Sequence, residues 1–385
     1  MYIKGNWSGR NSDTSTSIGR FTACSVHLKM TARLLVIVVC LASLSCGDST
    51  EKPAKRTYRM GFANSAPRFD DFNLFLQSLN LWTTRADAAI VNTEVPWDSL
   101  LSGVPAVDYV QRNYVGLVDF YRTRNLKVWV YIDPQNGLDR AADATALQLR
   151  GKSIADEDMQ EVYRRFVIVM DSLLNPDHLG LALETNLVRA ASPASIYLGV
   201  KQAANDVASE LKARGRTVPL SVSVQVDVAW GTLGGGGYTG IDQDFADFPF
   251  IEEVGLSSYP YFGIETPDQV PPNYYSRLVE GRNIPVFVSE GGWSSGSVST
   301  TTTSFISSEE EQAAYIRRHP VLLDEVNAIA WFQLPFTDID ISSVPPPVPD
   351  NLGYFIYLGL VDLNLAPKQA LADWDEIFRR ERKSN

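Results

Sequence analysis

The sequence alternates short apolar runs with longer amphipathic stretches, and this regularity limits the possible folds more than any other feature. Eight apolar runs have the length of buried strands: 58–63, 88–93, 127–132, 179–183, 220–226, 254–257, 286–289 and 328–332. Helices are expected between or after them, at 71–79, 107–124, 157–174, 195–214, near Phe245, and at 274–281, 309–326 and 368–380. Such alternation is typical of βα units on a parallel sheet.

Eight βα units are the number that a (β/α)8 barrel needs. The chain has 385 residues, 45% of them hydrophobic, which is enough to bury such a core. A doubly wound sheet also alternates, but it usually carries a glycine-rich phosphate loop after its first strand. The first strand here runs into GFANSAP (61–67), which has no such pattern. We therefore predict one α/β domain, a (β/α)8 TIM barrel, over residues 57–385.

The N-terminal segment has the features of an export signal. From Met30 the sequence MTAR supplies a positive charge, an apolar run follows at 34–44, and small residues come next. The run is shorter than the roughly 20 residues of a membrane span. We expect a signal peptide at 30–45 and a linker at 46–56. Met30 is expected to be the true start, which makes residues 1–29 a non-native upstream extension.

The cysteines all precede the main domain, at positions 24, 40 and 46, so no cysteine chemistry is expected in that domain. Ser43 and Ser45 suit ordinary signal cleavage, which would give a periplasmic or secreted protein. SLSC followed by Gly47 also resembles a bacterial lipoprotein signal. That resemblance implies a lipid on Cys46 and an exported protein held at the cell envelope. Membrane contact is expected only through this anchor.

The charge of the chain argues against anionic partners. The formal net charge is −11, and residues 1–45 hold five basic residues and one acidic residue, so their removal makes the balance more negative. A surface of this sign repels nucleic acid and anionic lipid headgroups. We therefore expect a neutral or cationic ligand and no nucleic-acid partner. The protein is also expected to be a monomer.

Carboxylates, amides and aromatic rings follow the predicted strands, at the barrel end where functional residues gather. Aromatic faces can stack on pyranose rings while amides bond the hydroxyl groups, so the pattern favours a sugar ligand. No histidine follows a strand, and Asp338 and Asp340 lack the further oxygen ligands that calcium requires. We expect no metal and no cofactor. The residues expected to contact the sugar are Trp97, Asn186, Gln225, Tyr259, Tyr261, Trp293, Trp331 and Gln333.

Glu184 and Glu290 are the expected catalytic pair, because each directly follows an apolar run, the fourth and the seventh. Two carboxyl groups suffice for glycoside hydrolysis: one protonates the departing oxygen, and the other attacks the anomeric carbon or activates water. Glu94 and Asp133 also follow strands, but each is followed by a turn that contains proline, and we expect both to be structural.

Several segments resemble glycoside hydrolase clan A, a group of retaining (β/α)8 glycosidases. They are LGLALETN (179–186), VGLSSYPYF (254–262), PVFVSEGGWSS (285–295), AIAWFQ (328–333) and GLVDLNLAPKQALADW (359–374). The second is similar to a segment of the arabinogalactan endo-β-1,4-galactanases, glycoside hydrolase family 53. The resemblance implies that Glu184 is the acid/base and Glu290 the nucleophile, that Tyr259 bonds the nucleophile, and that Trp331 is a sugar platform.

The resemblance fails at one position. The clan has an asparagine before its acid/base glutamate, where it bonds the sugar 2-hydroxyl, and this chain has Leu183. We predict a retaining hydrolase for a β-linked polysaccharide or oligosaccharide, with galactan as the first choice. Its Glu184 should have a raised pKa, its Glu290 should be ionised, and its carboxyl groups should lie roughly 5–5.5 Å apart. Leu183 favours the alternative, an inactive cell-surface lipoprotein that binds carbohydrate. A scaffold protein is the third possibility.

Overall fold

A computed structural model describes residues 54–383, apart from 234, 300–303 and 347. Eight parallel strands close into a barrel in the order β1-β12-β9-β8-β7-β6-β3-β2, which confirms the predicted fold. The barrel strands are β1 (Arg59–Ala63), β2 (Ala88–Glu94), β3 (Lys127–Asp133), β6 (His178–Gly180), β7 (Leu220–Gln225), β8 (Glu253–Ser258), β9 (Val286–Gly291) and β12 (Ala330–Gln333). Two small antiparallel sheets pair β4 (Gln135–Asn136) with β5 (Asp139–Asp143) and β10 (Val298–Ser299) with β11 (Ser304–Phe305).

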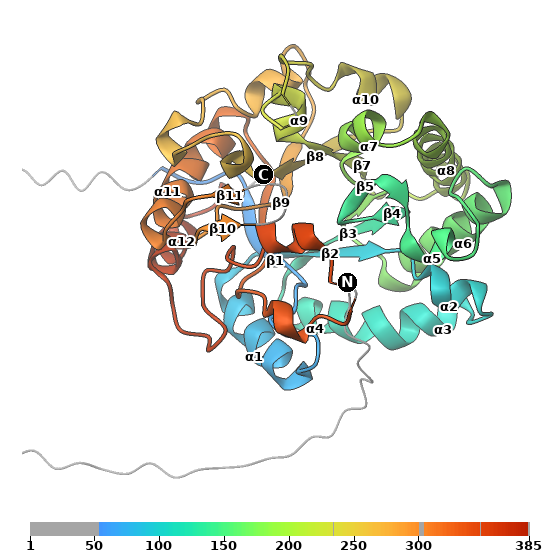
Figure 1. Cartoon of the computed structure of the whole chain (residues 1–385), viewed down its shortest axis with the longest axis horizontal. Helices are drawn as coiled ribbons and strands as arrows, with labels where there is room; N and C mark the ends of the chain where they lie inside the picture. Colours follow the sequence, from blue (N-terminus) through green and yellow to red (C-terminus); the bar gives the residue numbers. More distant parts are fainter. Residues whose placement is uncertain (1–53, 234, 300–303, 347, 384–385) are drawn as a thin grey trace, which may run out of the picture. The chain divides into compact units, whose positions relative to one another are not determined.

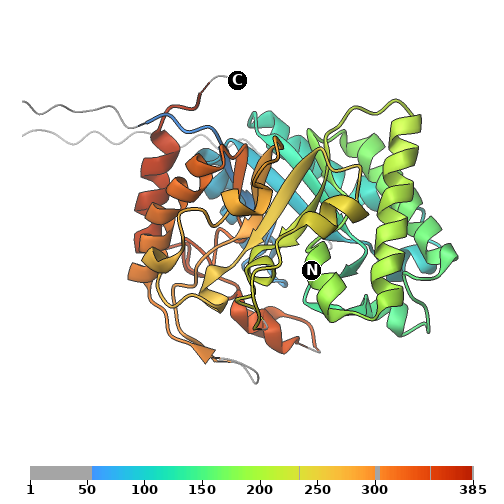
Figure 2. The ribbon, with the colours of Figure 1, turned by 90° about the horizontal axis from the view of Figure 1, so that it is seen from above.

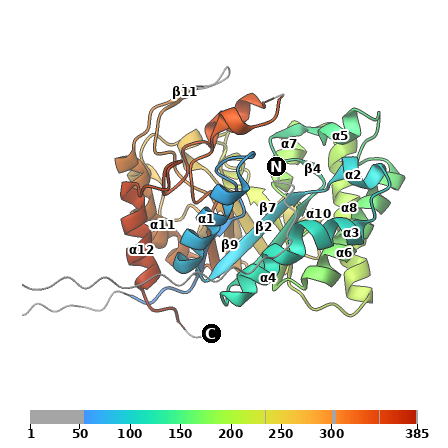
Figure 3. The same cartoon turned by 90° about the horizontal axis from the view of Figure 1, so that it is seen from below.

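Helices surround the barrel (Figure 1). They are α1 (Phe72–Trp82), α2 (Trp97–Leu101), α3 (Ala106–Val110), α4 (Gly116–Thr123), α5 (Thr145–Gln148), α6 (Glu157–Leu174), α7 (Thr185–Ala191), α8 (Ala194–Ala213), α9 (Val226–Trp230), α10 (Asp242–Asp247), α11 (Glu309–Glu325) and α12 (Gln369–Arg379). Helices α6 and α8 pack side by side, and α11 and α12 form a second pair across the barrel (Figures 2 and 3). No helix in the described part of the chain has the length and apolar character needed to cross a membrane.

The amphipathic pattern of the sequence determines the helices most clearly in α6. Its buried side chains include Met159, Phe166, Met170 and Leu174. Successive members are four or seven residues apart, which places them on one apolar face of the helix. The helix ends where Asn175 adopts a left-handed conformation with φ 43°, as is common at helix C-termini. Its bounds match the predicted 157–174.

The barrel interior is filled by large side chains that require glycine opposite them. The ring of Tyr131 crosses the interior, and its hydroxyl donates to Ser221 Oγ at 2.8 Å. A Cβ at Gly180 would lie 2.4 Å from this ring, and one at Gly255 would lie 2.6 Å from its hydroxyl oxygen. Both positions therefore need glycine, because a side chain would displace Tyr131 and the strands that it separates.

Three predicted elements differ from the structure. The fourth barrel strand ends at Gly180 rather than at 183, because the chain turns through a left-handed Glu184 (φ 48°) into α7. The expected helix at 274–281 is wrong: only a 3₁₀ turn, Ser276–Val279, forms there. The buried residues 274, 275, 278 and 279 do have helical spacing, but two prolines precede them and Gly281, with φ 76°, follows the turn. A π-helical turn, Gln111–Val115, interrupts the expected helix at 107–124.

The expectations about the N-terminus lie outside the described residues. They are the upstream extension at 1–29, the signal peptide at 30–45, the lipidated Cys46 and most of the linker at 46–56.

Candidate active site

A β-bulge directs Glu290 into the barrel mouth. Side chains alternate between the two faces of a strand, so regular pairing after Phe287, which lies inside, would turn Glu290 outward. The register between β8 and β9 shifts instead: Leu256 pairs with Val288, and Ser257 pairs with Glu290. Ser289 is the extra residue of the bulge, as in other bulges that reorient a side chain. Glu290 therefore shares the inner face with Ser257.

Glu184 reaches the same place from the opposite part of the barrel. Its left-handed backbone (φ 48°) precedes α7, and its N–H donates to Ser223 Oγ at 2.9 Å. The hydroxyl Oγ of Ser257 lies 2.6 Å from Glu184 Oε1 and 3.0 Å from Glu290 Oε1. The two carboxyl groups therefore contact one hydroxyl between them.

Arg140 is a member of the site that the sequence analysis missed. Its Nε donates to Glu184 Oε2 at 2.9 Å, and its Nη1 pairs with Asp133. All three side chains are buried. The hairpin β4–β5 delivers the arginine, and Asn136 forms its turn by accepting the N–H of Leu138 on Oδ1 at 3.0 Å. Asparagine and glycine are common turn residues, so Asn136 and Gly137 were a signal of this turn in the sequence. Asp133 is therefore more than a turn former, since it holds the guanidinium against Glu184.

Burial and charge determine the protonation of the pair. Burial and, next to it, the negative charge of Glu184 raise the pKa of Glu290 to about 7, although the positive charge of Arg140 opposes both. Burial likewise raises the pKa of Asp133 to about 6, against the effect of Arg140. The raised pKa of Glu290 differs from the expectation that this residue is ionised. The guanidinium of Arg140 bonds Glu184.

A cavity of about 180 Å³ lies beside Glu290 at the strand ends, and Glu184 is not among its lining residues. Its polar side is formed by Asn64, Asn92, Glu94, Asp133, Arg140 and Glu290. Its apolar side is formed mainly by loop residues, among them Phe69, Leu138, Leu183, Leu334, Leu352 and Phe355. Asn92 Nδ2 lies 3.4 Å from Glu290 Oε2. Glu94 Oε1 accepts the N–H of Gly137 at 2.9 Å, in keeping with a structural role.

Of the eight expected sugar contacts, Tyr259 lines the cavity. Its hydroxyl bonds to Glu290, as the resemblance implied. The buried carboxylate of Asp227 accepts its backbone N–H at 3.2 Å and also pairs with the hydroxyl of Tyr274. Burial raises the pKa of both Tyr259 and Asp227.

The structure corrects the expectation of tryptophan platforms. Trp97 donates to the carbonyl of Pro134 at 3.3 Å, and Trp293 donates to Ser307 Oγ at 3.1 Å. Both are buried, and neither lines the cavity. Trp331 is fully buried and packs against Trp374, with their ring centroids 4.5 Å apart. Its neighbours Ala330 and Phe332 face the barrel interior, so alternation along β12 directs Trp331 toward α11 and α12.

The other four expected contacts are buried and bonded to the protein, and they do not line the cavity. Asn186 donates to the Gln225 carbonyl at 2.8 Å, and the side chain of Gln225 accepts the N–H of Val228 at 2.8 Å. Tyr261 donates to the Tyr354 carbonyl at 3.0 Å, and Gln333 donates to the Leu358 carbonyl at 2.8 Å. These groups brace the loops around the site.

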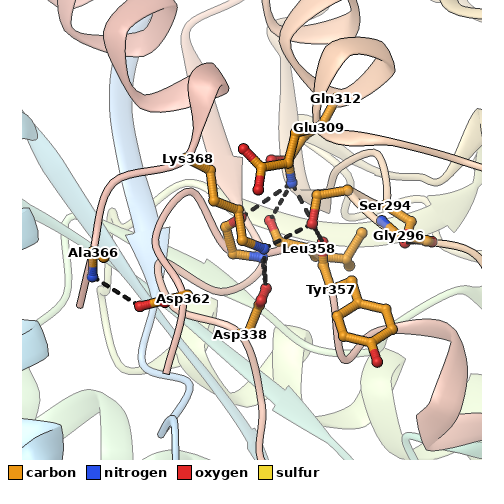
Figure 4. Close-up of polar contacts among 12 residues, drawn as sticks. Ser294, Gly296, Glu309, Gln312, Asp338, Tyr357, Leu358, Asp362, Ala366 and Lys368 are labelled. Carbon is orange, nitrogen blue, oxygen red and sulfur yellow. Dashed lines mark hydrogen bonds and ion pairs between the residues drawn. The ribbon is translucent and has the colours of Figure 1, made fainter. Parts of the chain in front are cut away.

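The segment 334–367, between β12 and α12, forms much of the apolar wall. Lys368 anchors its end: the buried ammonium group donates to Ser295 Oγ at 2.7 Å and pairs with Asp338 (Figure 4). Gln312 of α11 adds bonds from its Nε2 to the carbonyls of Leu358 and Gly359, at 3.2 and 3.1 Å. The GLVDLNLAPKQALADW segment thus fixes the wall of the cavity in place.

The comparisons with known proteins agree with this geometry at the level of the fold. No protein-family model and no curated protein matches the chain. Among solved structures, a β-glucosidase from Exiguobacterium marinum aligns with a TM-score of 0.59 at 12% identity, over 86% of this chain and 100% of its own. The exo-β-1,4-mannosidase Op5Man5 from Opitutaceae bacterium strain TAV5 aligns with a TM-score of 0.57 at 15% identity, over 85% of this chain.

The chain has the TIM-barrel fold of these glycosidases. A Bacteroides uniformis β-glucuronidase also aligns, with a TM-score of 0.53 at 15% identity. This chain spans 60% of the mannosidase and 36% of the glucuronidase. At such identities the likeness extends to the fold alone, because one barrel supports many chemistries. None of these three structures is a galactanase.

Proposed function

We propose that this chain is a β-glycoside hydrolase that retains the anomeric configuration and uses Glu184 and Glu290 as its catalytic carboxyl groups. The observation that carries the proposal is the contact of both carboxyl groups with Ser257 Oγ, at 2.6 and 3.0 Å. The distance between Glu184 Oε1 and Glu290 Oε1 therefore cannot exceed the sum of these two distances. Such spacing supports retention, which needs carboxyl groups roughly 5–5.5 Å apart, over inversion, which needs roughly 6.5–9.5 Å.

The number of protons in the pair also supports the proposal. Ser257 has one hydroxyl proton and can donate it to one carboxylate at a time. Its two contacts are both satisfied when it donates to Glu184 and accepts from a protonated Glu290, whose pKa of about 7 permits this near neutrality. The pair then holds one proton, and a retaining glycosidase needs one acid and one carboxylate.

The proposed reaction begins with a shift of this proton. Glu290 gives its proton to Ser257 as Ser257 gives its own to Glu184, which leaves Glu290 anionic. Glu184 then protonates the departing oxygen, and Glu290 attacks the anomeric carbon to form a glycosyl-enzyme. Water, deprotonated by Glu184, releases the sugar. Tyr259 holds Glu290 in position, and Arg140 orients Glu184.

Two observations point to different sugars within this class. The sequence resemblance favours galactan, whereas the three aligned structures are a glucosidase, a mannosidase and a glucuronidase by name. The test is hydrolysis of galactans, mannans, xylans, β-glucans and aryl β-glycosides by the domain 57–385. On the polysaccharides, Glu184→Gln and Glu290→Gln should each abolish turnover, whereas Glu280→Gln, at an exposed site, should not. The absence of hydrolysis across the panel would contradict the proposal.

One observation favours a second candidate, a protein that binds carbohydrate without cleaving it. Leu183 lines the cavity where the clan places its asparagine, so the expected bond to the sugar 2-hydroxyl is missing. Glu290→Gln separates the two functions: an enzyme loses turnover but keeps its ligand, whereas a binding protein has no turnover to lose. For either function we propose export and attachment to the cell envelope through a lipid on Cys46.

A further inference from the structure

The cavity divides into a polar floor and an apolar wall. The floor is formed at the strand ends, where Asn92, Glu94 and Glu290 meet. The wall is formed by loop residues with no polar side-chain atom, among them Leu334, Leu352 and Phe355. A ligand that fills both parts must itself be amphiphilic, because hydroxyl groups placed against the wall would lose their hydrogen bonds to water without replacement.

The wall is a fixed part of the cavity. Leu352 is 6% exposed, and the ring of Phe355 packs against Tyr259 with centroids 5.1 Å apart. Lys368 and Asp338 hold the segment that carries both residues, through a buried ion pair. These loops therefore present a preformed apolar surface next to Glu290.

The lining of the cavity argues against a long sugar chain. The three tryptophans expected to support a sugar chain, Trp97, Trp293 and Trp331, are buried elsewhere. Successive sugar rings would therefore lack stacking platforms here.

We infer that the substrate is a small β-glycoside with an apolar aglycone, an aryl or alkyl glycoside, whose sugar lies on the carboxylate floor and whose aglycone lies against Leu334, Leu352 and Phe355. This inference rests on the proposed hydrolase function, and it names aryl or alkyl glycosides in place of galactan as the substrate. The bond that breaks joins the anomeric carbon to the aglycone oxygen. Glu184 protonates that oxygen, so the aglycone leaves as a neutral alcohol or phenol.

The test compares glycosides that share one sugar and differ in the aglycone. Methyl, butyl and octyl β-glycosides of glucose, galactose and mannose are assayed with the wild-type domain. We expect kcat/KM to rise with chain length for the accepted sugar, by up to about fourfold per buried methylene. Equal kcat/KM for methyl and octyl glycosides, or faster release from a polysaccharide than from the octyl glycoside, would overturn the inference but leave the hydrolase function intact. No hydrolysis of any glycoside would overturn both.

Two variants make the test specific to the wall. Leu352→Ser should raise KM for the octyl glycoside roughly tenfold and leave KM for the methyl glycoside unchanged. Leu198→Ser is the matched control, because Leu198 lies on α8, is 57% exposed and does not line the cavity. Ile339→Ser, also in the wall, serves if Leu352→Ser fails to fold. Equal effects of a folded wall variant on both glycosides would contradict the placement of the aglycone.

Discussion

Replacement of Glu184 by glutamine should lower the pKa of Glu290. Glutamine keeps the volume of the side chain and an acceptor for the hydroxyl of Ser257. It removes the negative charge that, together with burial, raises the pKa of Glu290 to about 7. Two unit charges roughly 5 Å apart interact by about 3 kcal/mol at an effective dielectric constant near 20, which equals about 2 pKa units. We therefore expect the pKa of Glu290 to fall to roughly 5.

Two measurements can follow this shift. The first is titration of the ¹³C-labelled glutamate carboxyl resonances, with Glu290 assigned by its absence in Glu290→Gln. The second is the pH dependence of kcat/KM for a 2,4-dinitrophenyl β-glycoside, whose leaving group needs no acid. The wild type should lose activity on this substrate as the pH falls through about 7, because the proton that Glu290 then holds must shift to Glu184 before the carboxylate can attack. Glu184→Gln should keep its own plateau activity down to about pH 5.

The control for this prediction is Glu94→Gln. Glu94 also lines the cavity, but its charge is not among the main influences on the pKa of Glu290, so its removal should cause a smaller shift. An acid limb that stays near pH 7 in Glu184→Gln would refute the reasoning. It would mean that the two carboxyl groups do not interact electrostatically, and the proposed sharing of one proton would fail.

Four further predictions concern the relay, the wall, the barrel and the anchor. Ser257→Ala should lower kcat at least about tenfold and shift its pH optimum, with partial recovery in Ser257→Thr; an unchanged pH profile would contradict the relay. Lys368→Met should lower the free energy of unfolding in urea by about 3–5 kcal/mol, because it leaves Asp338 buried without its partner, whereas Lys201→Met, at a pair whose lysine side chain is 36% exposed, should cost less than about 1 kcal/mol. Gly180→Ala places a Cβ 2.4 Å from the ring of Tyr131 and should lower the melting temperature by several degrees, unlike Gly237→Ala, where nothing lies within 4 Å. Cys46→Ser should move the full-length protein from the membrane fraction to the soluble fraction in a bacterial host, and retention in the membrane fraction would contradict the lipid anchor.

The fold could be predicted from the sequence because its signal is repeated eight times. Each barrel strand is a short apolar run between amphipathic helices, and an error at one end of a strand does not alter the count. The fourth strand shows this: it ends three residues earlier than predicted, yet the barrel closes. The segment predicted as a helix at 274–281 has helical spacing of its buried residues but forms only a 3₁₀ turn, between two prolines and a left-handed Gly281.

The site was harder to predict because small changes of register decide which side chains face the cavity. The pair Glu184 and Glu290 followed from position at the strand ends. The bulge at Ser289, which turns Glu290 inward, leaves no mark in the sequence. Trp331 shows the opposite case, since its place at a strand end suggested a platform but alternation along β12 points it outward. Arg140 arrives from a hairpin outside the βα repeat, so a search of strand ends alone misses it.

The apolar wall depends on contacts between distant parts of the chain. Lys368 meets Asp338 and Ser295 only after the barrel has closed. Nothing in the composition of the segment 334–367 shows that its leucines would face Glu290 rather than the core. Our inference of a small apolar glycoside therefore rests on the structure, whereas the sequence suggested a polysaccharide.

The central claim is that Glu290 is the nucleophile of a retaining glycosidase, and trapping of the glycosyl-enzyme tests it most directly. The wild-type domain is incubated with 2,4-dinitrophenyl 2-deoxy-2-fluoro-β-glycosides of glucose, galactose and mannose, then digested and analysed by mass spectrometry. We predict one added fluoroglycosyl group per chain, attached to the peptide that contains Glu290. A label on the Glu184 peptide, or no label from a sugar whose glycosides the domain hydrolyses, would contradict the account.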